Sequence, residues 1–116
     1  MLLCIVQKRG EKKVQHSRTY YGETFLEKGD LAETNIKNKI QLEYYTTKQT
    51  NEEKDVYGIE VIKKEYKTNG IDTEISTRNY ISNSSKKVIE IINALKEHKV
   101  TPIGLNDVLE DLLKAN

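Results

Sequence analysis

A chain of 116 residues with 36% apolar residues, 32% charged residues and a formal net charge of +1 fits one small domain with a modest core. Basic and acidic side chains balance along it: six against five in residues 1–35, eight against eight in 36–80, and five against five in 81–116. This balance excludes a basic nucleic-acid-binding tail and an acidic arm.

The first residues, MLLCIV, are apolar and are followed by charged residues. They lack the basic region that precedes the apolar part of a signal peptide, and they are too short to cross a membrane. Cys4 is the only cysteine, so the chain has no internal disulfide framework. We therefore expect a cytoplasmic protein that does not associate with membranes.

Residues 1–35 give the weakest structural signal and read as an irregular or hairpin extension. Leu2 to Val6 could form a short strand, a turn around Gly10 would follow, and a second strand could run from Val14 to Tyr21. The segment GETFLEKGDLAET has few apolar anchors, so we expect a loop or one helical turn there.

Residues 36–80 predict an antiparallel β-meander. Ile36, Ile40, Leu42, Tyr44 and Thr46 alternate with polar residues, as in a half-buried strand. After the polar connection KQTNEEKD, a second strand places Tyr57, Ile59 and Val61 on one face, and Gly58 within it indicates a bulge or a close backbone approach. Asn69-Gly70 predicts a type I′ turn with positive φ at both residues, leading to a strand with Ile71, Thr73, Ile75 and Thr77 on one side.

Residues 82–116 change to helical periodicity. Val88, Ile91, Ile92 and Leu95 form one apolar stripe, and Ser82, Ser84 or Ser85 could cap its N-terminus. In the second helix, either Thr101 is the N-cap with Pro102 at the first helical position, or the helix begins after Gly104.

These elements predict a single α+β domain over residues 1–116: a three-stranded antiparallel sheet, with four or five strands if the N-terminal hairpin joins it, and two C-terminal helices packed on one face.

The segments VYGIEVIKKEY, ISTRNYIS and VTPIGLNDVLEDLL resemble a family of short clostridial proteins classed as a domain of unknown function. That family pairs a Tyr-Gly-Ile-Glu strand, here Tyr57 to Glu60, with a closing Val-Thr/Ser-Pro-Ile helix, here Val100 to Ile103. The resemblance covers roughly the C-terminal two-thirds, from about Ile40 to Leu113, and this chain has Gly104 where the family often has a histidine. It implies no activity, cofactor or catalytic residue.

We find no catalytic, cofactor or metal motif in the sequence. His16 and His98 have no neighbouring ligand at metal-binding spacing, and Cys4 is read as a small buried hydrophobe. Phosphate-binding glycine loops are absent, and the carboxylates fall in a polar connection or on the polar side of a helix. We therefore expect a protein that is not an enzyme and uses no cofactor.

Two surfaces remain as candidates. The last helix has more apolar residues than one contact needs, so it is read as mostly core with an edge that another protein, or a second copy in a homodimer, could cover. Its residues are Leu105, Val108, Leu109, Leu112 and Leu113. Lysines at a helix start and on the hairpin could instead bind an anion or nucleic acid, with Tyr66 and Tyr80 stacking on bases, although solvated lysines are the simpler reading. They are Lys63, Lys64, Lys67, Lys86 and Lys87.

The function expected from the sequence is a small non-enzymatic binding or regulatory module. It would act through protein–protein contact, using its C-terminal helices or a free sheet edge. The alternative is a nucleic-acid-associated accessory factor that uses a lysine-rich face.

Overall fold

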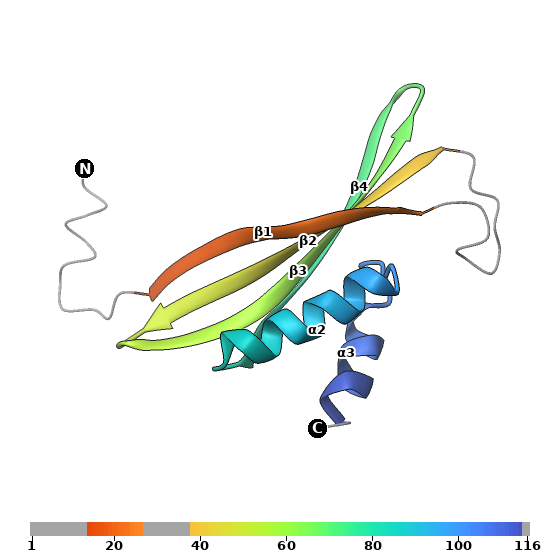
Figure 1. Ribbon diagram of the computed structural model, residues 1–116. Helices are drawn as coiled ribbons and strands as arrows, with labels where there is room; N and C mark the ends of the chain where they lie inside the picture. The colour runs from red at the N-terminus through yellow and green to blue at the C-terminus, as the bar shows by residue number, and fades with distance from the viewer. Residues whose placement is uncertain (1–13, 27–37, 115–116) are drawn as a thin grey trace, which may run out of the picture.

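The computed structural model describes residues 14–26 and 38–114, which form a four-stranded antiparallel sheet and two helices (Figure 1). The strands pair in chain order, and they are β1 (Val14–Leu26), β2 (Lys39–Asn51), β3 (Lys54–Lys67) and β4 (Gly70–Ser82). Helices α2 (Ser85–Glu97) and α3 (Leu105–Lys114) follow, and both lie on the same side of the sheet. The predicted α+β architecture is confirmed in its four-stranded form.

Strand β1 belongs to the main sheet. It pairs with β2 from Val14 opposite Asn51 to Leu26 opposite Ile40, with a bulge at Tyr21. The loop or helical turn expected from Gly22 onward is therefore wrong for residues 22–26, which continue the strand. The expected strand at Leu2 to Val6, the turn at Gly10 and the start of the next strand at Ile36 lie outside the described residues.

The core lies between the helix side of the sheet and the two helices. Ile40, Leu42 and Tyr44 of β2 are buried, as their alternation predicts, and Ile59 and Val61 of β3 are fully buried beside them. The helices contribute the buried residues Val88, Ile91, Ile92, Leu95, Leu105 and Leu109, and Val100 in the segment between them is buried in the same cluster. Burial of a single Leu or Ile side chain stabilises the folded state by roughly 1.5–3 kcal/mol. Because this layer contains most of the buried apolar side chains, it dominates the stability of the fold.

A two-residue turn joins β2 to β3, so the polar connection is much shorter than expected. Asn51 pairs with Lys54, and Glu52 and Glu53 between them have φ values of 55° and 68°. Positive φ at both central residues is the geometry of a type I′ hairpin turn, which normally takes Asn and Gly. This turn cannot be predicted from the sequence, because such a turn does not favour glutamate at its central positions.

The turn between β3 and β4 is displaced by one residue from its predicted position. Lys67 pairs with Gly70, so Thr68 and Asn69 are the central residues, and Gly70, with φ of 149°, begins β4. The residues with positive φ in the described chain do not include Asn69. The type I′ turn predicted at Asn69-Gly70 is therefore wrong, although the tight hairpin itself is present.

At Gly58 the backbone of β4 lies very close to that of β3. The register shifts between Tyr57 and Ile59, where the bulged segment of β4 contains Tyr80 with φ of 59°. A Cβ atom at position 58 would lie 2.3 Å from the carbonyl oxygen of Arg78. The bulge or close approach predicted from this glycine is confirmed in both respects.

Helix α2 begins and ends with recognisable caps. Ser84 is the N-cap, as one of the three predicted serines, and its hydroxyl accepts a hydrogen bond from the backbone N–H of Lys87. At the other end the N–H of Val100 bonds to the carbonyl of Leu95, and that of Lys99 bonds to Lys96. With Lys99 at a φ of 52°, these bonds form a Schellman motif, which directs the chain toward α3.

Helix α3 begins after Gly104, the second of the two starts predicted. The segment before it is a turn, in which the N–H of Gly104 bonds to the carbonyl of Thr101 at 3.1 Å. The fully buried hydroxyl of Tyr44 donates to the carbonyl of Val100 at 2.9 Å and so ties this turn to β2. Burial raises the pKa of Tyr44, which keeps its hydroxyl protonated as the donor.

Candidate interaction surface

The apolar residues of α3 lie mainly in the core. Leu105 and Leu109 are fully buried, and Val108, Leu112 and Leu113 are half-buried against the same cluster. Leu105 and Leu109 therefore cannot contact a partner while the domain stays folded. The exposed apolar residue of this region is Ile103, which is 80% exposed in the turn before α3.

The three predicted anion-binding lysines of the hairpin each face a carboxylate. Lys63 lies 3.8 Å from Glu74, Lys64 lies 3.4 Å from Glu43, and Lys67 lies 2.5 Å from Asp72. Asp72 raises the pKa of Lys67 through its hydrogen bond and its charge. These carboxylates largely neutralise the local positive charge of the three lysines.

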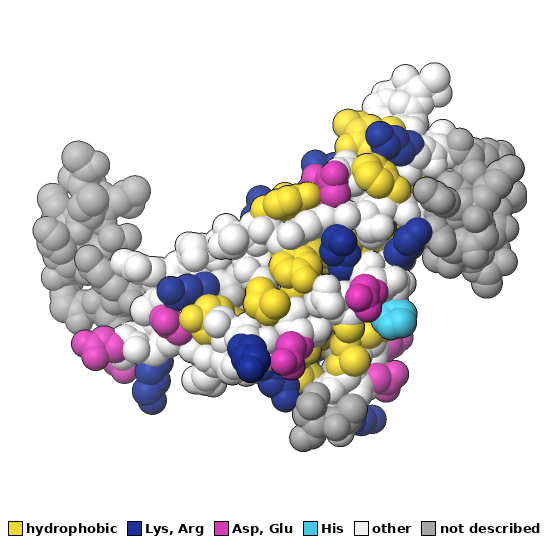
Figure 2. Space-filling model, viewed as in Figure 1, with side chains coloured by type: hydrophobic (Ala, Val, Ile, Leu, Met, Phe, Trp, Pro, Cys, Tyr) yellow, Lys and Arg dark blue, Asp and Glu magenta, His cyan; other side chains and the backbone are white. Residues whose placement is uncertain are grey.

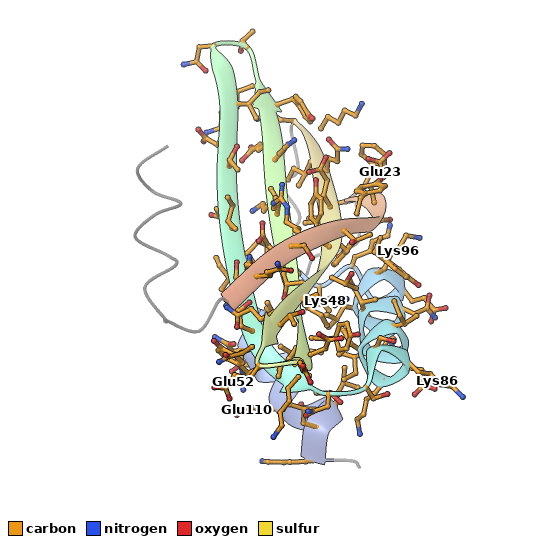
Figure 3. All side chains as sticks on the ribbon, turned by 90° about the vertical axis from the view of Figure 1, so that its left-hand side faces the viewer. Glu23, Lys48, Glu52, Lys86, Lys96 and Glu110 are labelled. Atoms are coloured by element: carbon orange, nitrogen blue, oxygen red, sulfur yellow. The ribbon has the colours of Figure 1, made fainter. Side chains whose placement is uncertain are left out.

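The remaining two lysines, Lys86 and Lys87, lie at the start of α2, far from the hairpin. Lys86 points away from the sheet at the opposite end of the molecule from the β3–β4 turn (Figure 3). The two possible stacking residues are separated in the same way, because Tyr66 is next to that turn and Tyr80 is in the bulge near the end of β4. The structure therefore does not bring the five lysines together into one face.

The side of the sheet that α2 and α3 leave uncovered has a composition that the sequence analysis did not identify. Opposite residues of antiparallel strands point to the same side, so the pairing assigns its members. We call this surface the open face, and from β1 to β3 it contains Arg18, Tyr20, Glu23, Phe25, Lys39, Gln41, Glu43, Tyr45, Glu60, Lys64 and Tyr66. Figure 2, in the view of Figure 1, shows hydrophobic, basic and acidic side chains mixed over the visible surface of the molecule, on which helices α2 and α3 also lie.

Arg18 organises one half of the open face. Its guanidinium carbon lies 4.1 Å from the ring centroid of Tyr45, and its Nη1 donates to Glu60 Oε2 at 2.6 Å. The ring of Tyr20 meets that of Tyr45 edge-on, with centroids 5.6 Å apart, and Tyr20 remains 52% exposed. These contacts connect β1, β2 and β3 and hold an arginine and two tyrosines in defined positions at the surface.

Lys39 occupies the corresponding place in the other half. Its Nζ lies 4.9 Å from the ring centroid of Phe25 and 5.7 Å from that of Tyr66. The hydroxyl of Tyr66 donates to Gln41 Oε1 at 2.5 Å, and the amide nitrogen of Gln41 donates to Glu23. The open face therefore contains a second cation between aromatic rings, fixed by neighbouring polar groups.

Two tyrosines of the open face, Tyr20 and Tyr45, have raised pKa values and remain protonated to higher pH than usual. Partial burial, followed by the charge of Glu43 and a hydrogen bond to it, raises the pKa of Tyr45, although Arg18 and Lys64 act in the opposite direction. Partial burial and the neighbouring Glu23 raise the pKa of Tyr20 in the same way. Both hydroxyls are thus neutral hydrogen-bond donors at physiological pH.

The other candidate groups of the sequence analysis do not form a site in the described chain. His16 and His98 are both exposed, one on β1 and the other at the C-cap of α2, and Cys4 lies outside the described residues. Residues 14–26 and 38–114 contain no group of three or more His, Cys, Asp or Glu side chains placed to hold a metal ion.

A pocket of about 250 Å³ lies at the end of the sheet near the β2–β3 turn. Glu52, Lys54 and Tyr80 line it together with Gln49, whose Oε1 is buried without a hydrogen-bond partner among the described residues. Of the candidate residues predicted from the sequence, this pocket contains Tyr80, one of the two possible stacking residues, and none of the five lysines.

The sequence contains one signal for the open face that could have been used. His16, Arg18 and Tyr20 alternate with Ser17 and Thr19, which is a period of two with the larger side chains on one face. This pattern is hard to recognise because the small polar residues, rather than the large ones, face the helices. The pairing of Arg18 with Glu60, 42 residues away, cannot be read from local pattern at all.

Comparison with known proteins places the chain in a family. A model of a family of unknown function, DUF6514, matches residues 23–115, so the match begins earlier than the resemblance noted from Ile40 and includes the second part of β1. Neither curated proteins nor solved structures gave a significant match. In the described part of the chain, no helix is long and apolar enough to span a membrane. Because the match covers most of its length, the chain belongs to the DUF6514 family.

Proposed function

We propose that this protein is a non-enzymatic binding module that contacts another protein through the open face of its sheet. The observation that carries this proposal is the arrangement of Arg18, Tyr20 and Tyr45, which stands at the surface in fixed geometry. Tyrosine and arginine are enriched in protein interfaces and at the residues that contribute most to binding.

Preorganisation favours binding by this surface. Immobilising a flexible side chain at an interface costs about 0.5–1.5 kcal/mol. In the free protein, Arg18 is already held by its contact with Tyr45 and its ion pair with Glu60, and Lys39 is held between Phe25 and Tyr66. A partner therefore meets side chains that have already lost much of their conformational freedom.

The charge of the open face favours a protein over a nucleic acid. Arg18, Lys39 and Lys64 are balanced by Glu23, Glu43 and Glu60, and nucleic-acid binding draws most of its affinity from excess positive charge. A partner with polar groups of both signs and an apolar centre would match this mixture. The proposal thus keeps protein–protein contact as the function and moves its surface from α3 to the sheet.

The setting of this function is also part of the proposal. The lone cysteine suits a reducing cytoplasm. The likeness of the Tyr57 to Glu60 and Val100 to Ile103 segments to short clostridial proteins favours a bacterial origin, and we propose a regulatory role as part of the binding function.

The test is affinity capture from native extract, treated with nuclease, using three forms of the protein. Tyr20→Ala removes an exposed aromatic ring from the open face, and Ile103→Ala removes an exposed apolar side chain from the helix side. A protein retained by the wild type and by Ile103→Ala but lost with Tyr20→Ala is the expected result. Equal retention by Tyr20→Ala would exclude the open face. A partner that is retained from untreated extract but lost after nuclease treatment would indicate binding to a nucleic acid instead.

A further inference from the structure

Strand β4 forms one edge of the sheet, and its outward backbone groups come from alternate residues. The two-residue turn makes Lys67 and Gly70 a hydrogen-bonded pair, and this parity continues up the strand to Arg78 opposite Ile59. The even-numbered residues of β4 therefore bond to β3. The N–H and C=O groups of the odd-numbered residues point away from the sheet, and these residues are Ile71, Thr73, Ile75 and Thr77.

This edge lacks several of the usual protections against pairing with another strand, although Asp72, Glu74 and Arg78 place charges on it. Natural edges are interrupted by bulges or proline or carry lysine. Strand β1, the other edge, has its bulge at Tyr21 near the middle, whereas the irregularity of β4 falls after Arg78. The regular segment 71–78 contains no lysine or proline, and its open-face residues include Ile71 and Ile75, which are 55% and 59% exposed.

We infer that two copies of this protein pair through their β4 edges, antiparallel and about a two-fold axis at Ile75. The occupant of the edge is a second copy because the segment is complementary to itself in this register. Residue 75 then faces residue 75 of the other copy, 73 faces 77, and 72 faces 78. Three outward pairs each exchange two backbone bonds, so about six hydrogen bonds form.

The side chains match as well as the backbone. Asp72 stands opposite Arg78 at both ends of the interface, Thr73 stands opposite Thr77, and the two Ile75 side chains meet at the axis. Opposite charges, paired threonines and paired β-branched residues are each favourable across antiparallel strands, by roughly 0.2–1 kcal/mol. Arg78 has donors to spare, since its bond to Asn106 at 3.1 Å uses only one of five N–H groups.

Neighbouring registers are worse for definite reasons. A shift of one residue would pair outward-pointing groups with groups already bonded to β3. The register that places Glu74 opposite Glu74 brings like charges together, which destabilises a cross-strand pair. The shift in the other direction runs the pairing into the bulge at Tyr80 and shortens it. The register centred on Ile75 uses the regular segment most fully.

This assembly extends the proposed surface without depending on it. Because paired residues point to the same side, both open faces lie on one side of a continuous sheet. Partner binding at the open face uses the residues around Arg18, whereas dimerisation uses the backbone of β4. An experiment can therefore disprove one of the two proposals and leave the other intact.

Disulfide trapping tests the register directly. In a Cys4→Ser background, Ile75→Cys places a thiol at the axis, where the two Cα atoms of a hydrogen-bonded pair are about 5.5 Å apart, within disulfide range. Ile71→Cys is the matched control, on the same strand and face and similarly exposed, but about 27 Å from its counterpart at 3.4 Å per residue. We expect rapid intermolecular cross-linking for position 75 alone. Equal cross-linking at both positions, or none at 75, overturns the inference.

Sedimentation equilibrium provides the second measurement. Proline at position 75 removes an outward N–H and leaves the β3 pairing intact, so Ile75→Pro should remain folded by circular dichroism and become monomeric. His16→Pro makes the equivalent change on the β1 edge and should remain dimeric. A dimeric Ile75→Pro, a monomeric His16→Pro or a monomeric wild type at high micromolar concentration would each contradict the inference.

Discussion

The backbone of Gly58 lies directly against the carbonyl oxygen of Arg78, where a Cβ atom would approach that oxygen to 2.3 Å and the Cα of Asn79 to 2.7 Å. Both obstacles are backbone atoms, so no side chain can move aside. Gly58→Ala should lower the free energy of unfolding by about 1–3 kcal/mol, as overpacking does. Urea unfolding measures this change.

The control for this prediction is Gly104→Ala, because a Cβ at position 104 meets nothing closer than 3.9 Å. It should change stability by less than about 1 kcal/mol. If the two alanine variants are equally stable, the close approach of β4 to β3 at Gly58 is not rigid.

Tyr44→Phe should destabilise the protein by about 1–3 kcal/mol, because it leaves the buried carbonyl of Val100 without the donor that now lies 2.9 Å from it. The substitution keeps the ring, so the packing of the core stays nearly unchanged. Thermal unfolding compared with the wild type measures the loss. A variant as stable as the wild type would mean that water reaches this carbonyl.

The same residue predicts how stability depends on pH. Burial raises the pKa of Tyr44 in the folded state above the ordinary value of 10.0. As pH rises, the unfolded chain therefore loses the Tyr44 proton before the folded protein does. The contribution of Tyr44 to the free energy of unfolding is constant below about pH 10 and falls above it. Urea titrations between pH 9 and pH 11, roughly the range around that value, should show a steeper fall for the wild type than for Tyr44→Phe. Parallel curves would contradict this assignment, since Tyr20 and Tyr45 are present in both proteins.

Glu53→Gly should stabilise the protein by about 1 kcal/mol, because residues other than glycine and asparagine are strained at a φ of 68°. Glu53→Ala is the control, since it removes the same carboxylate and keeps the Cβ that causes the strain. A gain in the melting temperature with glycine and none with alanine is expected. Equal gains would attribute the effect to charge.

Ser84→Ala should cost about 1 kcal/mol, since its hydroxyl accepts from the N–H of Lys87 at 3.2 Å and caps α2. Ser85→Ala changes the first residue of the helix without removing that cap. Chemical denaturation of both variants should separate them, and equal stability would show that water replaces the cap at little cost.

The parts of the fold that the sequence predicts correctly are those where one side of an element is apolar. The alternation of apolar residues predicts β2, through Ile40, Leu42 and Tyr44. Helical spacing predicts α2, through Val88, Ile92 and Leu95. Both patterns arise because one face of the element is buried. The close backbone approach at Gly58 is predictable for a different reason, because glycine inside a strand usually marks such an approach.

The parts that the sequence did not predict lack such a local signature. Glu52 and Glu53 form a turn that normally requires Asn and Gly, and β1 turns its small polar residues toward the helices. Thr47 is 2% exposed although it points to the open face, because Gly58 lets β4 approach it there and its hydroxyl bonds to Asn79. Contacts across strands determine each of these features.

The candidate surface also depends on contacts across strands, which the local sequence does not show. The sequence predicts that the apolar stripe of α3 is mostly core with an edge open to a partner, and two of its leucines, Leu105 and Leu109, are fully buried. The residues that gather on the open face lie on three strands and meet only once the register is fixed, as Arg18 and Glu60 do. No spacing within one segment encodes that meeting.

The central claim, that the open face binds a protein, is tested most directly by the affinity of the captured partner, measured by isothermal titration calorimetry. Arg18→Ala removes the cation that stacks on Tyr45 and pairs with Glu60, and Ile103→Ala is the control on the helix side. We predict at least roughly tenfold weaker binding for Arg18→Ala, the loss of about 1.4 kcal/mol or more that marks an important interface residue, and unchanged binding for Ile103→Ala. Unchanged binding for a folded Arg18→Ala, or weaker binding for Ile103→Ala alone, would contradict the claim.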